Sequence, residues 1–148
     1  MKIELQNKVI APSITLLRKI PLSGYRSLGR TRLVKLLEAK ITEISEVEQG
    51  MIEDYGLRDI NDKLVANGNG SYQIDPKKAA EWRTDHGKLM DETAVIEKGT
   101  YTNHESDIRD ILKHLKLDLT DADGDAYLAL CDALKVKFED DKPEKEGK

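Results

Sequence analysis

Three aspartates surround a glycine in the stretch LTDADGDAY, residues 119–127, and oxygen ligands around a glycine are typical of calcium loops. In such a loop the glycine is position 6, and ligands also stand at positions 1 and 12. With Gly124 at position 6, those two positions hold Leu119 and Leu130, which cannot bind calcium. Thr120 followed by acidic residues instead predicts a helix start, because threonine caps a first turn and the helix dipole favours negative charge there. We therefore predict no metal site.

The stretch GYRSLGRT, residues 24–31, has the spacing of a phosphate-binding loop, with Arg30 in place of the lysine. A true loop of this kind follows a buried strand, whereas this one follows a predicted helix that ends at Pro21. Nucleotide hydrolysis is not expected. Exposed N–H groups at a helix start, with cations nearby, still predict an anion-receptive surface, although a solvated basic helix start is the favoured interpretation of the same residues. The candidate binding residues are Arg26, Arg30, Arg32 and Lys35.

The remaining reactive side chains form no recognised catalytic constellation. His86 falls on an apolar helical stripe and is interpreted as a packed or interface residue. His104 and His114 lack the i,i+4 spacing of zinc ligands. Cys131, the single cysteine, lies in a periodic apolar pattern and is predicted to be buried. Because no nucleophile stands in a known motif either, we expect no catalytic residue, no cofactor and no enzymatic activity.

These side chains must be positioned by helices, of which one dominates the sequence. From about Thr31 to Tyr55, apolar residues recur at spacings of three and four, which predicts a long amphipathic helix ending at Gly56. Upstream, MKIEL alternates polar and apolar residues and predicts a short strand. A helix is expected between Pro12 and Pro21.

A turn-rich segment follows the long helix. Residues 67–70, Asn-Gly-Asn-Gly, accept the positive φ angles of tight turns and predict a β-hairpin over residues 63–74. Tyr72 on this protruding hairpin is a further candidate contact residue. Asp75 and Pro76 then predict the start of a second helix, antiparallel to the long one. Its inner stripe is Ala79, Trp82, His86 and Leu89.

The remaining patterns complete a mainly α fold with a small β component (α+β). TAVIEKG predicts a strand beside MKIEL, and a C-terminal helix pair is expected near residues 104–116 and 121–138. We expect a single helical domain over residues 1–138. The last segment, residues 139–148, has mixed charge and no core-forming residues, and predicts a disordered tail.

Composition limits the classes of partner. The chain has 148 residues, of which 35% are charged and 5% aromatic, a balance typical of soluble helical proteins. It contains no apolar run long enough to cross a membrane and no apolar leader. Cations gather between Arg18 and Lys40, but the net charge is −4. We therefore expect binding to neither membrane nor nucleic acid.

Several stretches together resemble a family of small uncharacterised proteins encoded by tailed phages and prophages of Gram-positive bacteria. They are MKIELQNKVIAPSITLLRKIPLSG, RTRLVKLLEAKITEI, EDYG, the hairpin followed by IDPKKAAEW, and EKGTYTN. The resemblance covers nearly the whole chain. It implies a phage origin and a location in the bacterial cytoplasm, and it assigns neither an activity nor catalytic residues.

Small accessory phage proteins often act by binding, so the resemblance implies a non-enzymatic protein that binds a host protein stoichiometrically and inhibits it, for example a defence component. Two alternatives stay open: sequestration of an anionic nucleotide or small ligand by a basic helix N-terminus, and a structural or assembly role in the virion. Because one long helix in a chain poor in aromatic residues cannot bury both its faces alone, we also expect a homodimer or a larger homo-oligomer.

Overall fold

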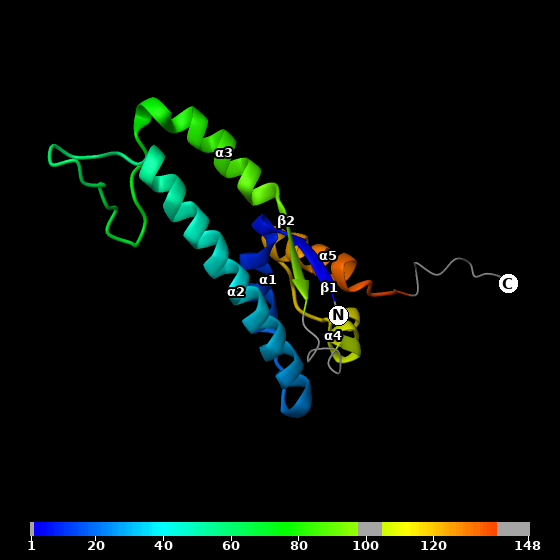
Figure 1. Ribbon diagram of the computed structural model, residues 1–148. Helices are drawn as coiled ribbons and strands as arrows, with labels where there is room; N and C mark the ends of the chain where they lie inside the picture. Colours follow the sequence, from blue (N-terminus) through cyan, green and yellow to red (C-terminus); the bar gives the residue numbers. More distant parts are fainter. Residues whose placement is uncertain (1, 98–104, 139–148) are drawn as a thin grey trace.

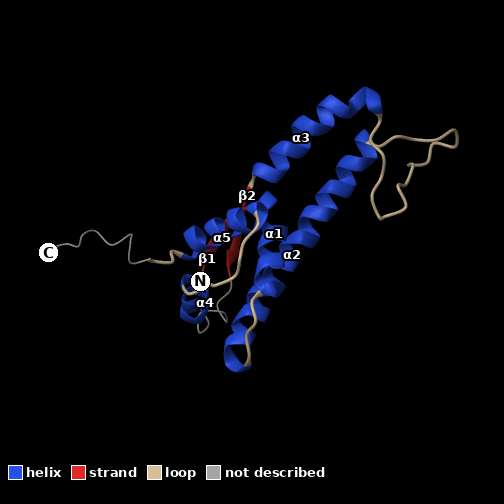
Figure 2. Ribbon diagram, turned by 180° about the vertical axis from the view of Figure 1, so that it is seen from behind, coloured by secondary structure: helices blue, strands red, loops and turns tan. Residues whose placement is uncertain are grey.

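Residues 2–97 and 105–138 are described by the computed structural model, in which an arm of two helices projects from a helical body (Figure 1). In chain order the elements are β1 (Lys2–Gln6), α1 (Asn7–Lys19), α2 (Gly24–Tyr55), the short 3-10 helix η1 (Pro76–Lys78), α3 (Ala79–Asp91), β2 (Thr93–Glu97), α4 (Glu105–Lys113) and α5 (Asp121–Leu134). Figure 2 shows the same arrangement from behind, with α3 running back along the second half of α2. The expected fold, mainly α with a small β component, is confirmed.

The two strands form an antiparallel sheet in which Ile3 pairs with Ile96 and Leu5 with Ala94. The side chains of Ile3, Leu5 and Ile96 are buried, while the alternate positions of β1 are exposed. This is the period-two pattern of a sheet with one face on the core. The strand pairing expected from the sequence is confirmed.

The root of the arm is fastened to the start of α1 by Asn7. The backbone N–H of Asn7 donates to the carbonyl of Glu92 at 2.8 Å, and its side-chain amide donates to the carbonyl of Leu89, also at 2.8 Å. The Asn7 residue is buried, so both bonds are shielded from water. Lys8 adds an ion pair with Asp91 at 2.9 Å. The end of α3 is thereby tied to the point where β1 becomes α1.

The apolar core lies in the body, where α1 packs against both α2 and α5. Its most completely buried large apolar side chains come from β1, α1, α2, α4 and α5. They are Ile3, Ile10, Leu16, Leu17, Leu33, Leu37, Ile108, Leu112 and Leu130. Burying side chains of this size is the main stabilising contribution to folding, so the body is the part of the chain that secures the fold.

The aspartates of LTDADGDAY begin a helix, as predicted. The hydroxyl of Thr120 accepts from the N–H of Asp123 at 3.2 Å and caps α5. The carboxylate of Asp123 is buried and accepts from Lys19 Nζ at 2.6 Å. That bond holds the pKa of Asp123 below its usual value. The ion pair joins α5 to the end of α1, so the acidic cluster serves the packing of the body.

The boundary expected near Pro12 is wrong, because α1 begins at Asn7 and continues through the proline. Proline has no N–H, which leaves the carbonyl of Lys8 without its helical donor. Lys8 is exposed, so water can satisfy that carbonyl. The anchored Asn7 fixes the helix start, and the proline is accommodated inside the helix.

Two other boundaries also differ. Helix α2 begins at Gly24 and not near Thr31, so GYRSLGRT forms helical turns. These turns leave Tyr25 and Leu28 exposed, and they therefore lack the regular apolar stripe that marks the rest of α2. Helix α5 stops at Leu134 because the next residue takes a left-handed conformation, and the predicted end at residue 138 is wrong. The expected tail, residues 139–148, lies outside the described residues.

Residues 56–75, which we call the tip, connect α2 to α3 at the far end of the arm. The hairpin expected around residues 67–70 is present as a bridge between Ala66 and Tyr72, with positive φ at Gly68 and Gly70. A second loop, closed by a bridge between Arg58 and Leu64, was not predicted. Its sequence, LRDINDKL, contains no glycine or proline that would mark a turn.

The dependence of the body on its core can be measured at Leu33, which is fully buried in α2. We expect Leu33→Ala to lower the free energy of unfolding by about 2–5 kcal/mol, because it removes apolar contacts and leaves a cavity. The matched control is Leu28→Ala in the same helix, where the side chain is 46% exposed. The control should change stability by less than about 0.5 kcal/mol. Urea denaturation followed by circular dichroism checks both values, and equal losses would contradict this assignment of the core.

Candidate functional site: the projecting α2–α3 arm

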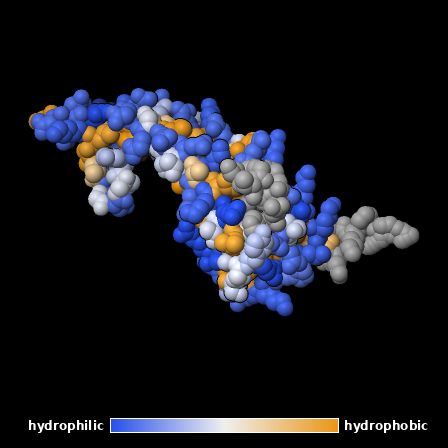
Figure 3. Space-filling model, turned by 60° about the horizontal axis from the view of Figure 1, so that its bottom comes forward, coloured by the Kyte–Doolittle hydropathy of each residue, from blue (hydrophilic) through white to orange (hydrophobic). Residues whose placement is uncertain are grey.

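The arm, residues 44–91, comprises the second half of α2, the tip, η1 and α3. Among the described residues, its only buried apolar side chains are Ile44, Ile52 and Leu89. Figure 3 shows hydrophobic residues scattered among hydrophilic ones along this part of the molecule. Two helices with so little apolar contact need a further source of cohesion. That source is a set of polar and aromatic side chains between α2 and α3.

We call this set the clasp; it consists of Glu48, Tyr55, Trp82, Asp85 and His86. The carboxylate of Glu48 lies 2.6 Å from His86 Nε2. The His86 ring stacks on Trp82 with centroids 4.7 Å apart and an interplanar angle of 19°. The rings of Trp82 and Tyr55 pack edge to face, with centroids 6.0 Å apart. The Tyr55 hydroxyl donates to the carboxylate of Asp85. Each clasp residue therefore contacts another across the two helices.

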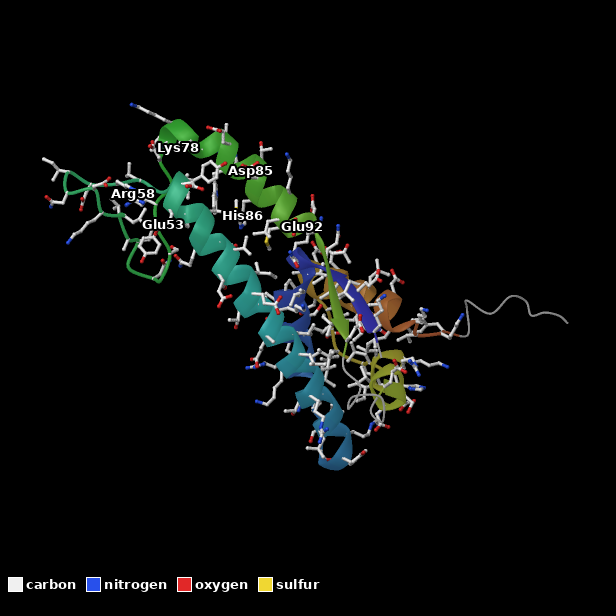
Figure 4. All side chains as sticks on the ribbon, viewed as in Figure 1. Glu53, Arg58, Lys78, Asp85, His86 and Glu92 are labelled. Carbon is white, nitrogen blue, oxygen red and sulfur yellow. The ribbon has the colours of Figure 1, made fainter. Side chains whose placement is uncertain are left out.

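Helix geometry explains why these five side chains meet. Glu48 and Tyr55 are two turns apart on one face of α2. Trp82, Asp85 and His86 stand at i, i+3 and i+4 on α3, which places them on the face turned toward α2. Figure 4 labels Asp85 and His86 on this helix. The sequence identified the stripe through Trp82 and His86, and the interpretation of His86 as a packed residue is confirmed.

Hydrogen bonding to Asp85 raises the pKa of Tyr55 to about 12. The phenol therefore stays neutral and keeps its proton as a donor to the carboxylate. The donors and acceptors of the clasp are directed at one another. Among the described residues there is no group of three histidine, cysteine, aspartate or glutamate side chains that could hold a metal ion. The clasp can thus fasten two helices in a defined register.

Charged side chains secure the junction between α2 and the tip. Lys78 Nζ donates to the carbonyl of Asp54 at 2.7 Å, where a cation is favoured by the C-terminal end of a helix. The guanidinium of Arg58 donates to the carbonyl of Glu53 at 3.1 Å and to its carboxylate at 3.0 Å. Figure 4 shows Glu53 and Arg58 together at this junction. The turn from α2 into the tip is therefore held by a residue of the tip, Arg58, and by a residue of η1, Lys78.

The predicted anion-binding residues are divided between packing and surface. Arg26 forms an ion pair with Asp110 of α4 at 2.9 Å, and Arg30 donates to the carbonyls of Leu17 and Ile20 at the end of α1. Those two cations therefore link α2 to its neighbours. Arg32 is exposed.

Lys35 is exposed as well and lines a groove of about 280 Å³ between α1 and α2. The groove is also lined by Arg18, Arg30, Thr31, Val34 and Glu38. Glu38 forms an ion pair with Arg18 and places negative charge inside the groove. Of the four predicted cations, Arg30 and Lys35 thus line one groove. Arg26 is paired with a residue of α4, and Arg32 is not part of the groove. Tyr72, the remaining candidate, is half-buried in the tip.

Residues 1–145 match the family described as "Protein of unknown function (DUF1617)". The chain belongs to the DUF1617 family. This confirms the expected membership of an uncharacterised family. Neither the curated proteins nor the solved structures include a match to the DUF1617 chain. No helix in residues 2–97 and 105–138 is both long enough and apolar enough to cross a membrane.

The contribution of the clasp to the arm can be tested at His86. We expect His86→Ala to raise the amide hydrogen exchange rates of α3 about fivefold, because losing a hydrogen bond costs about 1 kcal/mol. Amides of α1, in the body, should keep their rates. The control is Arg83→Ala on the exposed face of the same helix, which should leave α3 exchange nearly unchanged because arginine and alanine have similar helix propensities. Exchange followed by mass spectrometry measures this, and equal rates in His86→Ala and wild type would contradict the role of the clasp.

Two tyrosine hydroxyls, that of Tyr55 in the clasp and that of Tyr127 on α5, provide a pH test of how each is held. Because the folded-state pKa of Tyr55 lies above the ordinary value of 10.0, the neutral phenol contributes stability that is complete below pH 10 and is lost as pH rises through about 12. Burial raises the pKa of Tyr127 to about 12 as well. In an alkaline absorbance titration, Tyr55→Phe and Tyr127→Phe should each remove one tyrosine equivalent from the transition near pH 12. A loss of amplitude near pH 10 in either variant would show that its hydroxyl is not held as described.

Proposed function

We propose that this DUF1617 protein acts by stoichiometric binding to another protein, with the arm as its contact element, and that it is not an enzyme. The observation that carries the proposal is the construction of the arm. It projects from the body, holds few buried apolar side chains and is fastened internally by the clasp. An element that extends beyond the core and is held by its own interactions is suited to presenting a surface.

The chemistry of the arm favours binding over catalysis. Glu48 and His86 are paired with each other, and so are Tyr55 and Asp85, so these titratable groups are committed to structure. A general acid or base needs a group that can reach a substrate proton. The exposed surface is what remains for function.

We also propose, from the sequence resemblance, that the protein is encoded by a phage or prophage and acts in the bacterial cytoplasm. Its partner would be a host protein, such as a defence component, which it inhibits. A small protein that neutralises a host enzyme by occupying its surface needs rigidity and no turnover. The arm meets the first requirement through the clasp and through the bonds of Asn7 at its root. Preorganisation of this kind reduces the entropy that is lost on binding.

A second candidate function is the binding of an anionic nucleotide in the groove between α1 and α2. Arg18, Arg30, Thr31 and Lys35 line that groove and offer guanidinium, hydroxyl and ammonium donors to a phosphate. Glu38 in the same groove opposes an anion, which ranks this function below protein binding. The predicted homo-oligomer stays a prediction that analytical ultracentrifugation of the full chain can check.

One experiment separates the two functions. The full-length chain, tagged and produced in the bacterium that encodes it, is captured under native conditions and analysed by native mass spectrometry. We expect one protein bound at a fixed ratio and no retained nucleotide. Hydrogen exchange of the purified complex should show protection within residues 44–91. A bound nucleotide that is lost in Lys35→Glu but kept in Lys113→Glu, an exposed control on α4, would favour the second function. Protection confined to the body would contradict the role of the arm.

A further inference from the structure

The side chain of Ile60 stands at the apex of the first loop of the tip and is 99% exposed. Single exposed apolar residues are common on protein surfaces, so exposure alone has no functional meaning. What distinguishes Ile60 is the way its loop is held. A loop that is ordered by many hydrogen bonds presents its apex side chain in a fixed place.

The loop is closed mainly by Asp59. Its backbone N–H donates to the carbonyl of Lys63 at 2.8 Å, and its carboxylate accepts from the N–H groups of Asn61 at 2.8 Å and Lys63 at 3.0 Å. The N–H of Asp62 donates to the carbonyl of Asp59 at 2.9 Å. Asp62 has a φ of 63°, a left-handed conformation that is unfavourable for a residue with a side chain. These bonds offset that cost and fix the loop around Ile60.

Arg58 joins the loop to α2. One guanidinium nitrogen donates to the carbonyl of Asp62 at 3.0 Å, and the other donates to the carbonyl and the carboxylate of Glu53. The same side chain therefore spans the apex of the loop and the last turn of the helix. The position of Ile60 is set relative to the arm as well as within its own loop.

A closed ring of backbone hydrogen bonds ties the two loops of the tip together. The N–H of Leu57 donates to the carbonyl of Gln73, that of Gln73 to Val65 and that of Val65 to Leu57, at 2.9, 2.9 and 3.0 Å. Gly56 allows this close packing, because a Cβ there would lie 2.5 Å from a methyl group of Leu64. The tip is thus a small hydrogen-bonded unit at the end of the arm.

The second loop presents a neutral polar surface, and its apex lies apart from that of the first loop (Figure 1). Its sequence, NGNGSY, is made of the residue types that antibody contact loops favour: amides, glycine and serine for adaptable hydrogen bonding, and tyrosine for contact area. Asn67 donates to the Ser71 hydroxyl at 3.0 Å, which orders the loop. A protein interface usually has an apolar anchor with a polar rim, and Ile60 stands between Asp59 and Asn61 of its own loop.

Charge identifies the class of partner. The tip has two cations, Arg58 and Lys63, and three carboxylates, so its net charge is −1. Arg58 is also paired with Glu53. Such a surface does not attract the phosphates of a nucleic acid. A membrane surface needs a wide apolar face or several cations, and Ile60 stands among charged and amide residues. A protein pocket that admits one branched aliphatic side chain is the remaining match.

We propose that Ile60 is the anchor by which the tip docks into an apolar pocket of a partner protein, with the polar residues of its own loop, Asp59, Asn61 and Lys63, at the rim of that contact. This inference rests on the proposed binding function of the arm and goes beyond it by naming the contact residue and the chemistry of the partner. Because Ile60 is almost fully exposed, its replacement leaves the fold intact, so effects on binding can be read directly.

The test begins with a photo-crosslinking amino acid, benzoylphenylalanine, placed at position 60 of the full-length chain in the encoding bacterium. The control places it at Leu128, which is 61% exposed on α5 of the body. We expect one discrete adduct with a different protein from position 60 and none from position 128. An adduct of position 60 with RNA, or with a second copy of this chain, would overturn the inference.

The affinity of the isolated complex is then measured for point variants. Ile60→Asp should weaken binding at least tenfold, Ile60→Leu should restore most of it, and Asn61→Ala beside it should change it less than threefold. If the complex forms with unchanged affinity in Ile60→Asp, the anchor is refuted while the binding function stands. If no complex forms with the wild-type chain by capture or crosslinking, the binding function itself fails, and the anchor fails with it.

Discussion

The buried amide of Asn7 is the constraint on which the arrangement of the molecule depends. It stands where β1 becomes α1 and donates to the carbonyl of Leu89, while the backbone N–H of the same residue donates to the carbonyl of Glu92, where α3 becomes β2. Because β1 pairs with β2 in one register, and α3 leads directly into β2, these bonds set the direction in which the arm leaves the body. An unsatisfied amide at this buried position would be costly, so other orientations of the arm are disfavoured.

Body and arm are held together by different forces. In the body, side chains such as Leu17, Leu33 and Leu130 are removed from water, and the resulting cohesion does not depend on direction. In the arm, the clasp uses directional contacts, such as the short approach of Glu48 to His86. A sliding of α3 along α2 by one turn would leave these polar groups unpaired. The clasp therefore fixes a single register, which apolar contacts alone would specify less sharply.

Features that depend on neighbouring residues could be predicted from the sequence. Contacts between residues that are far apart in the sequence could not. The cap at Thr120, the start at Asp75 and Pro76, and the strand pair follow from neighbouring residues, and all three are confirmed. Arg30 could not be assigned in this way, because its acceptors at the end of α1 become neighbours only when α1 and α2 pack. The loop around Ile60 was missed because Asp59, an ordinary charged residue in the sequence, closes the turn with its side chain.

The same contrast explains why the arm, and not the basic segment, is the better candidate for function. Cations that are close in sequence suggested an anion site, but packing uses Arg26 and Arg30 to join helices of the body. In the tip, by contrast, the charged residues Arg58 and Asp59 hold a loop and leave the side chain at its apex exposed. Hydrogen bonds already order this exposed apex in the free protein, so less entropy is lost when the apex is bound. An ordered and exposed apex is what the proposed binding function needs.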